Sequence, residues 1–199
     1  MKKVIKIVLG AFLFFIIFWI CIYVGLVLFN FHKLNQKLED EWDQLFKLST
    51  ERVVETNRYL ANKNNISLDS IKIVLNRNII IREKYKKECS LDFEIIEYNF
   101  DKLLVNLIDS TKSNTFFELK EMIYENNSKL KIVNERYNDI VTDYNEYYYM
   151  FPNFIIGKLA KYKPKNHFSI KYGIVNKDPR IRANELPEWA IGVDTTFVK

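Results

Sequence analysis

Residues 7–29 read IVLGAFLFFIIFWICIYVGLVLF, and these 23 residues without a charged side chain decide the fold of the chain. As an α-helix the stretch is about 34 Å long, which is enough to cross the hydrocarbon core of a bilayer. A helix on the surface of a soluble domain keeps a polar face, and this one has none. The stretch is also too long for a secretory signal peptide, and no small-residue cleavage site closes it. The sequence therefore predicts an uncleaved transmembrane helix.

Lysines flank this apolar run on both sides. The loops on the cytoplasmic side of a membrane carry an excess of Lys and Arg. Each flank has three lysines, and the N-terminal three lie closer to the run: Lys2, Lys3 and Lys6 before it, and Lys33, Lys37 and Lys47 after it. This count favours residues 1–29 as a cytoplasmic stub plus transmembrane helix, with the rest of the chain outside the cytoplasm.

Residues 26–151, on the C-terminal side, contain neither glycine nor proline. Sheet proteins use these residues in many of their turns, so their absence over such a length favours long helices. Apolar residues recur at spacings of three and four, which is the pattern of a helical bundle. We expect an all-α fold: a single N-terminal transmembrane helix, followed by an antiparallel bundle of three long helices plus a short C-terminal helix. The expected ranges are 30–61, 67–109 and 115–151 for the long helices, and 153–160 for the short one.

The connections between these helices follow from capping signals. Asn62–Asn65 is the first connection and is followed by Ser67 as an N-cap; the second connection is 110–114, after which Thr115 and Glu118 have capping-box spacing. Ser90 with Asp92 also resembles a cap, so 67–109 is either one helix or two. This choice decides whether the last long helix ends near the membrane or far from it. With three helices the last one points away from the membrane, and with a break near Ser90 it returns toward it.

The region after the bundle is basic. Residues 161–182 carry seven Lys or Arg side chains against one acidic side chain, Asp178. We assign 30–163 to the bundle and 164–199 to a basic, loop-like tail. The ordinary interpretation is a solvated, mobile tail, although Leu186–Ile191 could dock on the bundle. The alternative is a tail that binds anionic lipid, and a nucleic-acid partner is not expected.

A tyrosine–asparagine repeat marks the end of the third long helix. Tyr137-Asn138 and Tyr144-Asn145 are separated by the seven-residue interval of one helix face, and Phe151-Pro152 follows five residues later. The pattern resembles the LemA family, which has Tyr-Asn-x-x-Val-x-x-Tyr-Asn and then Phe-Pro at the same interval. The resemblance covers roughly 30–168 and implies a membrane-anchored helical domain, but it supplies no reaction. From the residues themselves, we expect Asn138 and Asn145 to be buried or half-buried amides that cap neighbouring turns, with ligand recognition as the alternative.

Two features depart from the family pattern. About seven residues are missing between Trp42 and Glu55, in a stretch that usually holds paired arginines. Asn127 and Asn134 stand where the family usually has Glu and Arg. Since a buried charged set removed as a group is less costly than one broken singly, we expect that set to be lost here.

No pattern of reactive residues stands out. His32 and His167 lie far apart, there is no ligand spacing for a metal, and there is no glycine-rich loop for phosphate. We therefore predict no catalytic, cofactor or metal site. The candidates for a partner interface are aromatic and basic residues around the Phe-Pro pair: Tyr147, Tyr149, Lys158, Lys161 and Lys163.

The resulting expectation is a single-pass protein of the bacterial inner or plasma membrane. Its function would be that of a non-enzymatic scaffold or adapter for a membrane or envelope protein. The alternative is a lipid- or ligand-sensing module that uses the aromatic and basic C-terminal region at the membrane surface.

Overall fold

The computed structural model describes residues 2–62, 69–109 and 116–185, and the fold over these ranges is helical. It contains six α-helices and a short 3₁₀ helix, with no strand among the described residues: α1 (Lys2–Ala61), α2 (Asp69–Arg82), η2 (Glu83–Tyr85), α3 (Leu91–Asp109), α4 (Phe117–Tyr149), α5 (Asn153–Leu159) and α6 (Pro179–Glu185). The expected connections and caps at Asn62–Asn65, Ser67, 110–114 and Thr115, and the expected docking of Leu186–Ile191, lie wholly or largely outside these ranges.

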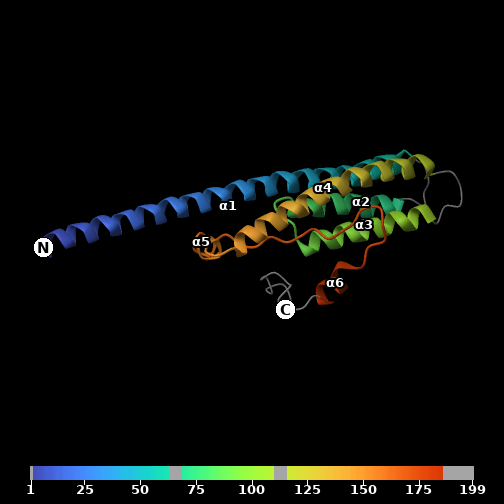
Figure 1. The fold of residues 1–199 in the computed structure, drawn as a ribbon. Coiled ribbons are helices and arrows are strands. Elements are labelled where there is room, and N and C mark those ends of the chain that lie inside the picture. The colour runs from blue at the N-terminus through green and yellow to red at the C-terminus, as the bar shows by residue number, and fades with distance from the viewer. Residues whose placement is uncertain (1, 63–68, 110–115, 186–199) are drawn as a thin grey trace.

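Helix α1 is continuous over 60 residues and has two different halves. Its first half projects alone beyond the rest of the molecule, and its second half lies among the other helices (Figure 1). In the first half the large apolar side chains are exposed, whereas Phe31, Trp42 and Leu45 in the second half are buried. By length and composition α1 is the one helix among the described residues that could cross a membrane.

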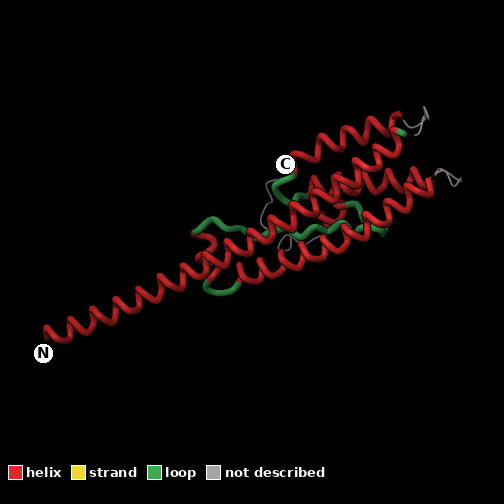
Figure 2. Tube along the Cα trace, turned by 90° about the horizontal axis from the view of Figure 1, so that it is seen from above, coloured by secondary structure: helices red, strands yellow, loops and turns green. Residues whose placement is uncertain are grey.

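Helix α4 runs back along the second half of α1. Asn126 donates to Glu55 at 2.7 Å and Arg136 donates to Gln44 at 2.9 Å. Near the other end of the contact, the rings of Phe31 and Tyr147 are 5.0 Å apart. Residue numbers rise on one helix as they fall on the other, so the C-terminal end of α4 lies beside the middle of α1 (Figure 2).

The segment between these two helices is broken, which is one of the two arrangements that the sequence allows. The chain leaves α2 through η2 and starts α3 at Leu91. Ser90 caps this start, because its hydroxyl accepts from the backbone N–H of Phe93 at 3.2 Å. A side chain at the break is also fixed, since the Trp42 indole donates to the Lys86 carbonyl at 2.9 Å. The bundle therefore has two helices where the longest expected helix would lie.

The core consists of two apolar clusters. One lies nearer the apolar half of α1 and includes Phe31, Trp42, Phe93 and Tyr137. The other lies toward the far end and includes Val53, Leu60, Leu75, Phe100 and Leu119. Along α1, the buried polar residues Ser49 and Arg52 fall between the two clusters.

The short helix α5 packs on α1 at the border between its two halves. The Tyr23 hydroxyl donates to Asn153 Oδ1 at 3.0 Å. Gly157 meets the Phe31 ring so closely that an added Cβ would lie 3.0 Å from Phe31 Cζ. Glycine is the residue that permits this approach. Helix α5 is thus held beside residues 23–31.

The chain after α5 differs from the expected solvated tail. Phe168, Ile170 and Tyr172 are buried in the first core cluster, where the Phe168 ring lies 5.9 Å from that of Trp42. Residues 179–185 form α6 rather than a loop. Several positive charges of this region are also paired, as in the contact of 2.6 Å between Arg182 and Glu94. Charge alone predicted a solvated segment because the apolar residues here, at alternate positions, are too few to stand out.

Candidate functional site

The asparagines of the Tyr-Asn repeat hold the extended segment after α5 against α4. Asn138 Nδ2 donates to the Phe168 carbonyl, and the Phe168 N–H donates to Asn138 Oδ1, both at 2.8 Å. Asn145 makes the same pair of bonds with Lys165, both at 2.8 Å. A side-chain amide offers one acceptor and donors in the geometry of a peptide group, so it pairs with an extended chain as a strand would. These half-buried amides bind a distant backbone rather than cap neighbouring turns.

Asn134 extends this row by one turn of α4. Its Nδ2 donates to the Ile170 carbonyl at 2.7 Å. Asn134 is one of the two positions at which the chain departs from the LemA pattern. Its amide therefore replaces the usual charged side chain by a third bond to the extended segment.

The tyrosines of the repeat pack this same region. Tyr137 donates to the Asn166 carbonyl at 3.2 Å, and its ring lies 5.4 Å from that of Trp42. The Tyr144 ring lies 5.9 Å from Phe31 and has the Lys165 ammonium 5.9 Å above it. The repeat thus joins α1, α4 and the extended segment.

Phe151 and Pro152 lie in the turn between α4 and α5. The peptide bond between them is cis. Asn153, directly after them, donates to the Tyr147 carbonyl at 3.2 Å and accepts from Tyr23. The Phe-Pro pair therefore marks the place where the chain passes from α4 to the border of the apolar half of α1.

The predicted interface residues gather at this end of the bundle. Tyr147 is half-buried and accepts from Asn30 Nδ2 at 3.3 Å. Tyr149 is exposed and packs edge-on against Tyr148, with the ring centroids 5.2 Å apart. Lys158, Lys161 and Lys163 are exposed on and just after α5. Because the middle segment is broken, the five residues lie beside the apolar half of α1 and not at the far end.

A second polar site, which the sequence did not reveal, lies between the two core clusters. The Arg52 guanidinium contacts Glu97 at 2.9 Å and Asp101 at 2.8 Å. Arg82 donates to Glu97 and to Ser49, and the Ser49 hydroxyl donates to Glu97 at 2.8 Å. Arg52, Arg82, Ser49 and Glu97 are fully buried. We refer to Ser49, Arg52, Arg82, Glu97 and Asp101 as the ionic layer.

The ionic layer also reaches α4 and the extended segment. Arg52 donates to Asn127 at 2.7 Å, and the Tyr172 hydroxyl donates to Glu97 at 2.9 Å. The Arg52 guanidinium lies 4.9 Å from the centre of the Phe100 ring and 4.8 Å from that of Tyr172. Asn127, which stands where the LemA pattern has a charged side chain, thus binds a buried ionic layer formed by other residues of this chain.

Burial and the two guanidiniums set the protonation of the carboxylates. Burial raises the pKa of Asp101 to about 6 against the attraction of Arg52. Burial also opposes the ionisation of Glu97, but Arg82 and Arg52 together outweigh it and hold the pKa of Glu97 below its usual value. Glu97 is thus the permanent negative charge of the layer, and Asp101 is a carboxylate that titrates in mildly acidic solution.

The sequence carries a signal for this layer in its spacing. Arg52 lies three and four residues from Ser49 and Leu48 on the buried face of α1, and Glu97 lies between Phe93 and Phe100 on α3. A charge at helical spacing from core residues indicates a buried ion pair. The partners cannot be identified this way, because they come from different helices.

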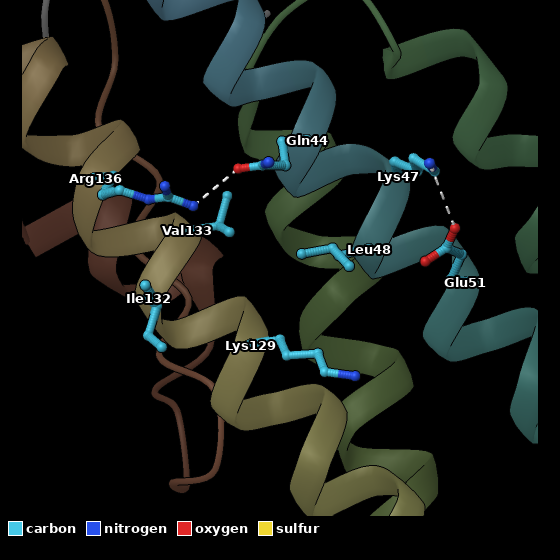
Figure 3. A pocket seen from close by; sticks show the side chains of 8 residues that line it. All are labelled: Gln44, Lys47, Leu48, Glu51, Lys129, Ile132, Val133 and Arg136. Carbon is cyan, nitrogen blue, oxygen red and sulfur yellow. Dashed lines mark hydrogen bonds and ion pairs between the residues drawn. The ribbon is translucent and has the colours of Figure 1, made fainter.

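An open groove of about 360 Å³ lies between α1 and α4 (Figure 3). Its apolar part is Leu48, Ile132 and Val133. Its charged side chains are in part tied to the walls, as in the bond from Arg136 to Gln44. No group of three or more His, Cys, Asp or Glu side chains placed to hold a metal occurs among the described residues.

Comparison with known proteins agrees with the motif. The model of the LemA family matches residues 109–182, which include α4, α5, the extended segment and the start of α6. No curated protein and no solved structure matches the chain significantly. The matched region contains the Tyr-Asn repeat, the Phe-Pro pair and the segment that the repeat binds. Over residues 109–182 and in these motif residues, the chain is therefore similar to the LemA family.

Proposed function

We propose that this chain is a single-pass membrane protein of the bacterial envelope whose antiparallel helical bundle is a non-enzymatic scaffold or adapter for protein partners. The observation that carries the proposal is the change of surface along α1. The same unbroken helix has exposed apolar side chains in residues 4–20 and core side chains from Phe31 onward. Apolar surface in water costs about 25 cal/mol per Å², so the first half belongs in lipid.

The state of the interior polar groups supports a structural role for them. The charged side chains of the ionic layer bind one another across helices, as Arg52 binds Glu97. Asn134 and Asn138 of α4 bind the backbone of the extended segment. Such networks hold neighbouring elements in one arrangement. A rigid bundle at a fixed place on the membrane suits display of a binding surface.

Exposed apolar side chains on α2 form one such surface. Ile73 and Val74 are exposed, and Ile80 is 72% exposed. Helix α2 lies in the bundle part of the molecule, away from the apolar half of α1 (Figure 1). Clustered exposed apolar side chains are typical of protein interfaces.

The experiment is site-specific photo-crosslinking of the full chain in native membranes. A photoreactive residue at Ile80 is expected to give an adduct that an anchor-only control, residues 1–29, does not give. The substitution Ile73→Asp, on the same helix, is expected to remove this adduct at unchanged membrane level. The absence of any adduct at Ile80 above the anchor-only control would contradict the proposal.

The proposed orientation, with the bundle outside the cytoplasm, has its own test. A C-terminal tag on the full chain is expected to be digested by protease added to cells whose inner membrane is intact. A tag that is digested only after the inner membrane is opened would show that the bundle lies in the cytoplasm. The proposed scaffold role would be unaffected.

A further inference from the structure

We propose that residues 149–163, which we call the interfacial turn, enter the membrane interface beside α1 and give the chain a second contact with lipid. This inference rests on the proposed membrane span of α1. Its partner is the boundary between acyl chains and anionic headgroups, and not another protein.

The depth of the interfacial turn follows from its contacts with α1. Asn153 accepts from the Tyr23 hydroxyl at 3.0 Å, and Gly157 packs on Phe31. Tyr23 lies six residues inside the end of the apolar run, or about 9 Å along the helix axis, and Phe31 lies two residues beyond that end. Helix α5 therefore lies alongside the last turns of the apolar run and the first turn after it.

The buried residue Val27 is independent support for this placement. It belongs to the uncharged run, yet it is only 2% exposed and is part of the core cluster that contains Phe31 and Tyr144. The bundle thus begins before the apolar run ends. The Tyr23–Asn153 hydrogen bond also gives each polar group a partner at a depth where water is scarce.

The outer face of the interfacial turn is apolar. Phe151 is 76% exposed and Leu159 is 80% exposed, and Met150, Phe154 and Ile155 are also exposed. In water these side chains would form an unpartnered apolar patch. At the depth fixed by Tyr23 and Phe31, the same side chains meet acyl chains, as do those of an amphipathic helix lying in an interface.

Exposed lysines lie close to this apolar face in the sequence and on the adjoining part of α1. Lys158, Lys161 and Lys163 are exposed on the interfacial turn, and Lys33 and Lys37 are exposed on the adjoining part of α1. No ion pair among the described residues involves these five ammonium groups. Lysine buries its stem and keeps its ammonium at headgroup level, and each basic residue near an anionic surface contributes about 1 kcal/mol of attraction. Exposed apolar side chains beside unpaired lysines match the boundary between acyl chains and headgroups, and this combination argues for lipid over a protein partner.

The test uses the full chain in nanodiscs, with Cys21 and Cys89 replaced by serine and single spin-labelled cysteines introduced. The substitutions Phe151→Cys and Leu159→Cys report on the interfacial turn. Phe15→Cys reports on the apolar half of α1, and Tyr124→Cys, at an exposed position on α4, reports on water. We expect the ratio of accessibility to oxygen over accessibility to a nickel chelate to be several-fold higher at positions 151 and 159 than at 124.

The pattern of accessibility distinguishes failure of the lipid contact at 149–163 from failure of the proposed membrane span. If 151 and 159 match 124 while 15 stays protected from nickel, the span stands and the inference is overturned. If 15 is also open to nickel, the span itself fails. If 151 and 159 are closed to both reagents, a second copy of the chain covers them, and the lipid contact is overturned.

The lysines are tested by lipid composition. In discs that contain phosphatidylglycerol, Lys158, Lys161 and Lys163 changed together to glutamine are expected to lower the ratio at 159. The same change is expected to have a smaller effect in discs of phosphatidylcholine alone. The matched control changes the exposed Lys120, Lys129 and Lys131 of α4 to glutamine, and no effect is expected. Equal effects of the two triple variants, or of the two lipids, would overturn the role of the headgroups.

Discussion

The side-chain amide of Asn138 and the backbone of Phe168 are paired by two hydrogen bonds of 2.8 Å, across 30 residues of sequence. This pair places the Phe168 ring against the rings of Trp42 and Phe93 in the core, with centroids 5.9 Å from each. The Tyr-Asn repeat therefore acts here as a clamp on a segment that has no helix or strand of its own.

Removal of this clamp is expected to destabilise the bundle. In Asn138→Ala the N–H and carbonyl of Phe168 lose their partners, and two unsatisfied polar groups lower the free energy of unfolding by about 2–4 kcal/mol. Urea unfolding of the detergent-solubilised chain measures the change. Asn106→Ala, at an exposed position on α3, is the matched control and is expected to change little. Equal stability of the two variants would contradict the role given to Asn138.

Removal of the Glu97 carboxylate, which the two arginines of the ionic layer share, is expected to destabilise the bundle. Glu97→Ala leaves the guanidiniums of Arg52 and Arg82 buried without their common partner, which costs about 3–5 kcal/mol. The control is Glu125→Ala, which breaks the exposed pair with Lys129 at 2.7 Å. Exposed pairs contribute little to stability, so the control is expected to match the parent protein. A loss for Glu97→Ala no greater than the control would show that the layer is dispensable.

Asp101 is expected to make the bundle more stable in mild acid. Its folded pKa, raised to about 6 from 3.8, means that the folded state binds a proton more tightly than the unfolded state does. The contribution of Asp101 to stability therefore falls as pH rises from about 4 to about 6. The lowered pKa of Glu97 changes stability only at a lower pH than this window. Asp101→Asn is expected to flatten the dependence of the melting temperature on pH in this window. An unchanged slope in the variant would refute the assignment.

Gly157 is expected to be intolerant of any side chain. A Cβ there would lie 3.0 Å and 3.2 Å from two atoms of the Phe31 ring and 3.2 Å from Tyr148. Phe31 cannot give way easily, since its ring is also stacked on Tyr162 at 4.8 Å. Gly157→Ala is expected to cost about 1–3 kcal/mol through overpacking. Gly25→Ala, where the added Cβ meets nothing within 4 Å, is expected to be neutral or slightly stabilising. If the two variants unfold alike in urea, α5 is not held by this contact.

The periodic features of this chain could be predicted from the sequence, and the contacts across it could not. The absence of glycine and proline between Leu26 and Phe151 predicted long helices, and the uncharged run at 7–29 predicted the apolar helix. These are local properties, which each helix carries in its own residues. The break near Ser90 remained open because a cap signal inside a helical pattern does not show whether the chain turns back.

Helical periodicity did not predict the asparagine clamp or the ionic layer. Asn138 binds a segment whose residues have neither helical nor long alternating periodicity. The spacing of Arg52 from core residues signals burial, but it does not identify Glu97 and Asp101 as its partners. In both cases the partner is chosen by the packing of other helices, which one-dimensional spacing does not encode.

Helix α1 is unbroken, so its apolar half and its bundle half move together as one rigid rod. The part of α1 from Asn30 to Ala61 is about 48 Å long, so a tilt of ~10° at the apolar run displaces the far tip by ~8 Å. Hydrophobic segments tilt in response to bilayer thickness. With residues 7–29 in a bilayer, as proposed, a change in bilayer thickness would therefore displace Leu60 and the helices packed around it sideways, because α1 has no hinge.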